Sequence, residues 1–170
     1  MVKVSKFVVL LSGVIGLVAF FLPILAVESS GIEGKLSAYQ IVSGIETVKD
    51  VVKQAPNTGT AEEKQAIDQA NAELDKYRGF VYAIFGPAAL LALFGLIGVL
   101  RGRFGRGLAV PTLLFGLLGL AIWYLLDSAA NEVGAEHGES VKGVAMHLLL
   151  VTGLGGTMAG LISTVVPDRG

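Results

Sequence analysis

Four long segments of this chain contain no Asp, Glu, Lys or Arg and consist mainly of apolar residues. They are residues 7–27, 79–100, 107–126 and 144–166. A helix rises 1.5 Å per residue, so about 20 residues span the hydrocarbon layer of a bilayer, which is roughly 30 Å thick. The four segments therefore predict an all-α membrane protein. We expect a single membrane domain over residues 1–170, in which four transmembrane helices form a bundle.

The composition agrees with this fold class. Only 16% of the residues are charged, against about 25% in an ordinary soluble domain. The chain has no cysteine, which excludes structural disulfides, cysteine-ligated zinc and thiol catalysis. Its net charge of −1 gives no reason to expect a nucleic-acid partner. The first segment is longer than the apolar core of a signal peptide, about 7–15 residues, so we expect it to be retained as a helix.

The charges between the segments predict the orientation of the chain. The bases before the first helix and in the turn between helices two and three are Lys3, Lys6, Arg101, Arg103 and Arg106. Residues 28–78 instead carry nine acids and six bases, and residues 127–143 carry four acids and one base. Because basic loops stay on the cytoplasmic side during insertion, we expect both termini in the cytoplasm and both acidic segments outside.

Residues 28–78 predict an extracytoplasmic amphipathic helical hairpin between helices one and two. Residues 37–54 and 61–77 each place apolar side chains at helical spacing, and the turn-forming sequence PNTGT separates them. Thr60 and Glu63 fit a capping box, and the second helix is expected to continue into the second segment as one long rod. Three roles stay open for the hairpin: it caps the bundle, it binds a partner or another copy, or its first helix lies on the membrane surface.

Each transmembrane segment contains two glycines that are three residues apart. The pairs are Gly13 and Gly16, Gly95 and Gly98, Gly116 and Gly119, and Gly153 and Gly156, and the last segment adds Gly160. Small residues let membrane helices approach closely, where no water drives their association. With the predicted orientation, all four pairs fall in the central-to-inner half of the membrane and predict a packing layer. Two interpretations of the last helix stay open: it is the most central helix, or it also contacts a second copy.

The prolines and the ionisable residues complete the prediction. Pro23 and Pro87 are expected to bend helices one and two. We predict no catalytic, cofactor or metal site. Ser12 and His147 lie at opposite ends of their helices, so they cannot form a protease pair. His137 lies among three glutamates in NEVGAEHGES, a set that can bind a divalent metal, but we favour a solvated acidic loop. The three arginines of the turn set the topology and can also contact anionic lipid headgroups.

Two stretches near the first helix resemble a pattern in small bacterial membrane proteins. They are AFFLPILAV at 19–27 and GKLSAYQIVSG at 34–44, and the resemblance is to uncharacterised four-helix transmembrane proteins with a Phe-Leu-Pro end to helix one. Ala38 replaces the glycine of that pattern, and Ile24 replaces its tryptophan. The resemblance implies a bacterial inner membrane and adds no activity. The topology is also similar to that of claudins and tetraspanins, by analogy only, because their outer cysteines are absent here.

These features favour a non-catalytic structural subunit. It would self-assemble, or join a larger membrane complex as an accessory subunit, through its glycine-rich helix packing and its outer hairpin. The alternative is a channel or small-solute transporter subunit whose path forms between copies, and an enzyme ranks behind both. Contacts of glycine on glycine without a void would favour the first reading, and a water-filled path bordered by Thr and Ser the second. The expected partners are the lipid bilayer and further copies or other membrane subunits, with no cofactor.

Overall fold

The structure is a computed structural model that describes residues 2–29, 32–54, 61–137 and 142–166. Its helices are α1 (Val2–Ala19), α2 (Ala38–Gln54), α3 (Ala61–Leu100), α4 (Arg106–His137) and α5 (Val144–Val165). One antiparallel hairpin, β1 (Pro23–Ser29) with β2 (Ile32–Ser37), lies between α1 and α2. The described chain is therefore predominantly helical, as the four apolar segments predict.

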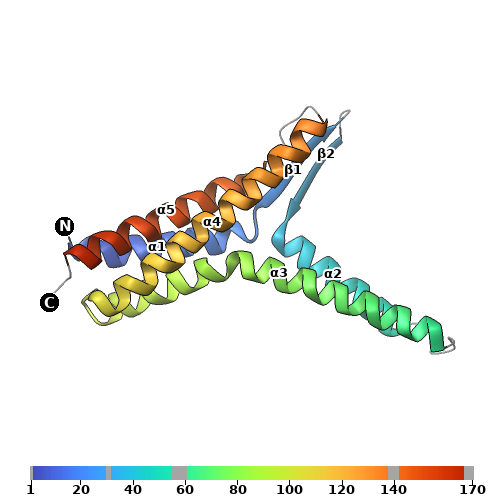
Figure 1. Ribbon diagram of the computed structural model, residues 1–170, viewed down its shortest axis with the longest axis horizontal. Coiled ribbons are helices and arrows are strands. Elements are labelled where there is room, and N and C mark those ends of the chain that lie inside the picture. The colour runs from blue at the N-terminus through green and yellow to red at the C-terminus, as the bar shows by residue number, and fades with distance from the viewer. Residues whose placement is uncertain (1, 30–31, 55–60, 138–141, 167–170) are drawn as a thin grey trace.

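The helices pack into one body from which two arms diverge (Figure 1). In that body α1 lies against α3 and α5, and α4 lies against α5 and α3. One arm is formed by the end of α4 together with the β1–β2 hairpin, and the other by α2 and the first part of α3 (Figure 1). Both chain termini lie at the opposite end of the body from the arms.

Within the described residues, three helices are long and apolar enough to cross a membrane. The qualifying parts are Ile67–Leu100 of α3, Arg106–Ala135 of α4 and Val144–Val165 of α5. The apolar part of α1, Val4–Ala19, is shorter. A membrane-embedded helical protein is thus supported by length and composition.

The expected helix over residues 7–27 is wrong in its second part. After Ala19 the chain makes short-range turn bonds, such as Phe20 N to Leu17 O at 3.2 Å, and β1 then begins at Pro23. Proline has no N–H, and its ring clashes with the preceding helical turn. It also favours an extended conformation at Leu22. The helix therefore ends at Ala19, shortly before Pro23, and Pro23 does not bend a longer helix as expected.

The long rod expected from the outer hairpin is present as α3, a helix of 40 residues that contains Pro87 (Figure 1). The start of α2 has a capping box that the sequence analysis missed. The Gln40 amide donates to Ser37 Oγ at 3.2 Å, and the Ser37 amide donates to Gln40 Oε1 at 2.9 Å. This reciprocal pair satisfies backbone donors that a helix start leaves without partners. The capping box expected at Thr60 and Glu63 lies outside the described residues.

The arginine turn between α3 and α4 is more than a charged loop. Gly102 adopts a φ of 69°, a left-handed conformation that suits glycine after a helix end. Phe104, in the middle of the turn, is completely buried and belongs to a buried apolar cluster with Val9, Leu91, Ala109 and Ala159. The turn therefore inserts an aromatic anchor into the helix body.

Candidate functional site

The first glycine pairs bring α1 and α3 into backbone contact. A Cβ added at Gly13 would meet the backbone of Ala92, and one at Gly95 would meet the backbone of Leu10. Gly16 faces Ala88 of α3 and also Thr152 of α5. Each of these positions lacks room for even one added carbon, so close approach of the helices depends on glycine there.

The other glycine pairs join α4 to α5. A Cβ at Gly116 would meet Gly156 and Thr157 across the interface, and one at Gly160 would meet the backbone of Leu113. One at Gly119 would lie 3.6 Å from the Cα of Gly153, which is ordinary contact. A Cβ at Gly153 would meet Leu120, and one at Gly156 would meet Leu91 of α3. α5 therefore uses its glycines within the chain, between α1 and α4.

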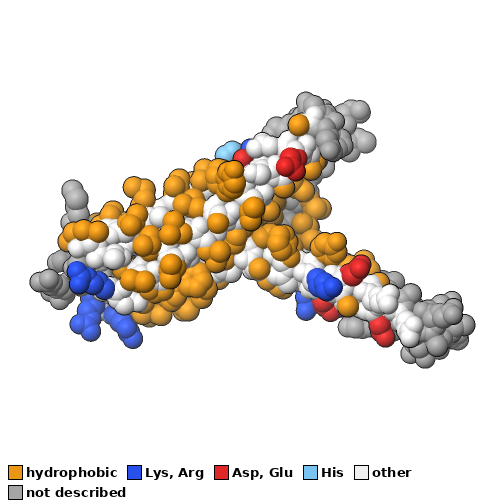
Figure 2. Space-filling view, viewed as in Figure 1, with side chains coloured by type: hydrophobic (Ala, Val, Ile, Leu, Met, Phe, Trp, Pro, Cys, Tyr) orange, Lys and Arg blue, Asp and Glu red, His pale blue; other side chains and the backbone are white. Residues whose placement is uncertain are grey.

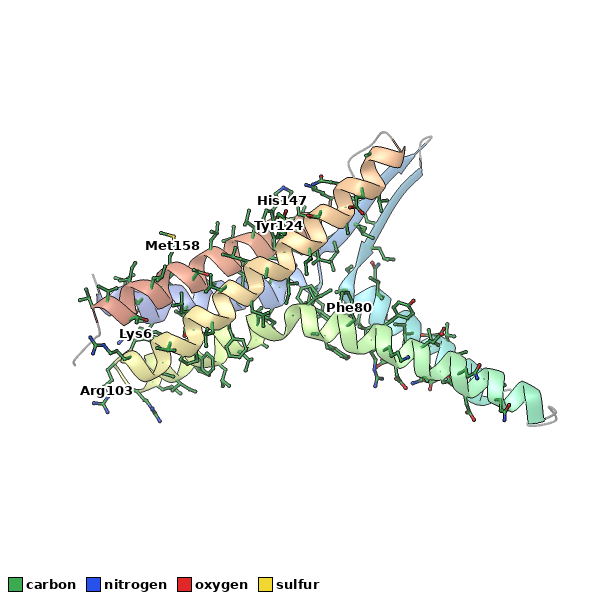
Figure 3. The ribbon with its side chains drawn as sticks, in the orientation of Figure 1. Lys6, Phe80, Arg103, Tyr124, His147 and Met158 are labelled. Carbon is green, nitrogen blue, oxygen red and sulfur yellow. The ribbon has the colours of Figure 1, made fainter. Side chains whose placement is uncertain are left out.

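The outward face of α5 has a different composition. Its exposed large hydrophobic side chains are Val144, Val151, Leu154, Met158, Leu161, Ile162 and Val165, and His147 near the start of the helix is also exposed. Met158 points away from the helix body (Figure 3). The glycines of α5 are buried or partly buried, so this face is mostly bulky and apolar and suits lipid contact rather than close helix packing.

The predicted arginines gather at the end of the body that holds both termini (Figure 2). Arg101, Arg103 and Arg106 are all exposed. Nearby, Lys6 Nζ donates to the carbonyl of Gly102 at 2.8 Å and so connects α1 to the turn. A Cβ at Gly98 would meet the ring of Phe104. This end is thus a basic surface over a packed aromatic anchor.

Four threonine hydroxyls of the helix body bond within their own helices. Thr112, Thr152, Thr157 and Thr164 each donate to the carbonyl four residues earlier, at 2.7–2.8 Å. Among the described residues, Ser163 Oγ is the buried side-chain atom for which no hydrogen-bond partner is found. The threonines are thus occupied by helix carbonyls and do not border a polar path.

No metal centre is present in the part of the chain that the structure describes, where no three His, Asp or Glu side chains lie close enough to hold an ion. Glu139 of the acidic sequence around His137 lies outside the described residues. Asp127, at the start of that sequence region, pairs with Lys142 at 2.5 Å. The pair connects α4 to the segment just before α5.

An apolar cleft of about 560 Å³ lies where the two arms leave the helix body. Its lining comes from β1, α2, α3, α4 and α5. The lining residues are Ile24, Leu25, Ile41, Ile45, Leu74, Tyr77, Phe80, Val81, Ile84, Leu126, Ala129, Ala130, Val133 and Met146. Phe80 marks the junction of the body with the α2–α3 arm (Figure 3). Apart from the Tyr77 hydroxyl, the lining side chains carry no oxygen or nitrogen.

The cleft exists because the apolar faces of α2 and α3 cover each other only in part. On α2, Ala38, Val42 and Ile45 are buried as expected, but Val48 is half exposed. On α3, Ile67 and Tyr77 are among the apolar side chains at helical spacing in residues 61–77, and both are exposed. Lys49 of α2 pairs with Asp75 of α3 at 2.6 Å, and this contact holds the helices together beside the uncovered apolar faces.

The position of β1 also contributes to the cleft. The Gly143 amide donates to the carbonyl of Ile24 at 2.8 Å, and a Cβ at Gly143 would meet the carbonyl of Pro23. β1 is thereby held against the start of α5, and it presents Ile24 and Leu25 to the cleft. The sequence analysis missed this site because it assigned residues 23–27 to a helix and did not consider Gly143.

Comparison of the chain with known protein families, with curated proteins and with solved structures finds no match. The class of the protein therefore rests on its own residues. They define a helical, membrane-embedded protein with a glycine packing layer at one level and an apolar cleft at another.

Substitution of a packing glycine should destabilise the fold, whereas substitution of an unpacked glycine on the same helix should not. We expect Gly95→Ala to lower the free energy of unfolding by about 1–3 kcal/mol, the usual cost of overpacking, because the new Cβ meets Leu10. Gly86→Ala is the matched control, since nothing lies within 4 Å of its Cβ position. Denaturant titration of the purified protein measures both. Equal stability of the two variants would contradict the packing role.

Proposed function

We propose that the protein is a non-catalytic structural subunit of a membrane assembly, formed with further copies or with other membrane proteins. The proposal rests on the close packing inside the helix body. Glycine contacts bring α1, α3, α4 and α5 together, Leu91 lies fully buried against Gly156, and the threonines bond to their own helices. Such an interior suits a rigid body more than a solute path.

We further propose that all four helices of the body cross a bacterial cell membrane. At 1.5 Å per residue, the 18 residues of α1 extend roughly 27 Å. The extended residues of β1, from Pro23 on, lengthen the crossing by about 3.3 Å each. Together they reach the roughly 30 Å of a hydrocarbon layer, so the shorter α1 can still belong to a four-helix transmembrane bundle.

The proposed orientation places both termini and the arginine turn in the cytoplasm and both arms outside. Its support is the distribution of charge along the molecule: among the described residues, bases gather at the end of the body away from the arms, whereas acids lie on the arms, together with further bases on the α2–α3 arm (Figure 2). At the base of the arms Phe20 packs edge-on against Phe85, with ring centroids 5.2 Å apart, and stacks on Tyr82 at 6.4 Å. Aromatic rings favour the boundary between hydrocarbon and water.

The α2–α3 arm is the surface we assign to contact with other subunits. The glycines of α5 face inward, so they leave no glycine-rich face for a second copy among the described residues of that helix. The arm instead exposes Tyr39, Val48 and Ile67 beyond the uncharged segments. Exposed apolar side chains in an aqueous compartment favour burial against a partner.

The orientation can be measured with single cysteines, because the natural chain has none. Intact cells that express Asp68→Cys should be labelled by a membrane-impermeant maleimide, since Asp68 lies on the outer arm. Cells that express Arg103→Cys should be labelled only after permeabilisation. The reverse pattern would contradict the proposed orientation, and the cysteine-free chain provides the background signal.

The assembly can be measured as the mass of the complex extracted from native membranes. Val48→Arg should reduce that mass, because it places a charge on the proposed contact surface. Thr47→Arg, at an exposed neighbouring position of α2, is the matched control and should leave the mass unchanged. A wild-type particle with the mass of one chain, or an assembly indifferent to Val48→Arg, would contradict the proposal. Ion flux into vesicles that hold only the wild-type protein would support the channel alternative.

A further inference from the structure

We propose that the apolar cleft between the arms binds the acyl chain of a membrane phospholipid. The walls present carbon almost throughout, and Tyr77 supplies the one side-chain hydroxyl among the lining residues. A polar group buried there would lose its bonds to water, at a cost of about 1–3 kcal/mol, and gain no partner. The site therefore selects hydrocarbon.

The size of the cleft favours a chain-like ligand over a protein segment. Its volume of about 560 Å³ lies within the range of about 300–1,000 Å³ for small-molecule sites. A helix with side chains is about 10–12 Å wide and rises about 5.4 Å per turn, so one turn fills roughly 400–600 Å³. The cleft holds about one such turn, whereas helix-in-groove recognition uses anchors spread over two turns.

The position of the cleft gives a lipid chain a route into it. Its floor includes Ile84 and Met146, which belong to the helices apolar enough to cross a membrane. Its walls continue to Leu74 and Val133, beyond the uncharged segments. Phe80, at the junction, is exposed and is itself one of the lining residues. An acyl chain can thus move from the hydrocarbon layer into the cleft without crossing water.

The charges beside the cleft predict which part of the lipid is recognised. Lys49 pairs with Asp75, and Lys142 pairs with Asp127. Arg78 lies 3.8 Å from Glu46 and 3.6 Å from Asp75. Since each of these cations already faces a carboxylate, none of them is reserved for an anionic headgroup. Affinity should follow the chain and be indifferent to headgroup charge.

The test uses the full chain in phosphatidylcholine vesicles that contain a trace of the same lipid with a photoreactive diazirine near the end of one acyl chain. After irradiation, peptide mass spectrometry should find adducts on cleft residues such as Leu74 and Val133. Ala129→Trp, at an exposed position of the lining, should fill the cleft and lower these adducts at least tenfold. Ala121→Trp, also exposed on α4 but outside the lining, should leave them unchanged.

Two further measurements vary the length of the labelled acyl chain and the charge of the headgroup. Shortening the labelled chain by several methylenes should move the adducts to other lining residues, because the diazirine then reaches a different depth in the cleft. An anionic phosphatidylglycerol probe should label the cleft as well as the phosphatidylcholine probe does. Absence of cleft adducts, adducts indifferent to Ala129→Trp, or labelling that follows headgroup charge would each overturn the proposal. A dimer that Ala129→Trp abolishes, without cleft adducts, would assign the cleft to a second copy.

Discussion

The close approach of helix backbones at glycine is the constraint on which the rest of this structure depends. Lipid tails are as apolar as leucine, so helices in a membrane gain little from hiding hydrocarbon and must gain from contact itself. Gly13 against Ala92 and Gly95 against Leu10 provide such contact between α1 and α3, and Gly116 against Gly156 provides it between α4 and α5. Because α5 lies between α1 and α4 and shares Leu91 of α3, these interfaces join into one layer.

Where the glycine layer ends, the fold changes character. Towards the end of the body that holds the arginine turn, Phe104 is buried and Lys6 bonds to the turn. Packing is therefore continuous up to the basic surface. Towards the other end, Pro23 marks the end of helical structure in the first segment and α4 continues to His137, and the two arms diverge. The cleft is the space that this divergence leaves between faces that remain apolar. The glycine layer and the apolar cleft thus lie at different positions along the same helices.

The sequence predicts the helical class well, because charge-free segments of membrane length admit few alternatives. It also predicts the α2 helix and the continuous α3 rod, whose signals are local: apolar spacing and the absence of a breaker around Tyr77. The β1–β2 hairpin escapes prediction, since the apolar residues after Pro23 fit a helix and a strand equally well. The cleft could not be predicted either. Apolar residues at helical spacing indicate that one face of a helix is apolar, but they do not indicate which element packs against that face. The role of Gly143 could not be predicted, because it depends on contact with Pro23, which is distant in sequence.

The most direct test of the account asks whether the glycine contacts are made within one chain. Ala88 of α3 and Thr152 of α5 both lie against Gly16, and the natural chain contains no other thiol that could react. The Ala88→Cys, Thr152→Cys double variant would be reconstituted as an equal mixture of ¹⁴N and ¹⁵N chains and treated with mercuric ion, which bridges neighbouring thiols. The account predicts bridged peptides of a single isotope. Bridged peptides that pair ¹⁴N with ¹⁵N would show that the layer forms between copies and would contradict it.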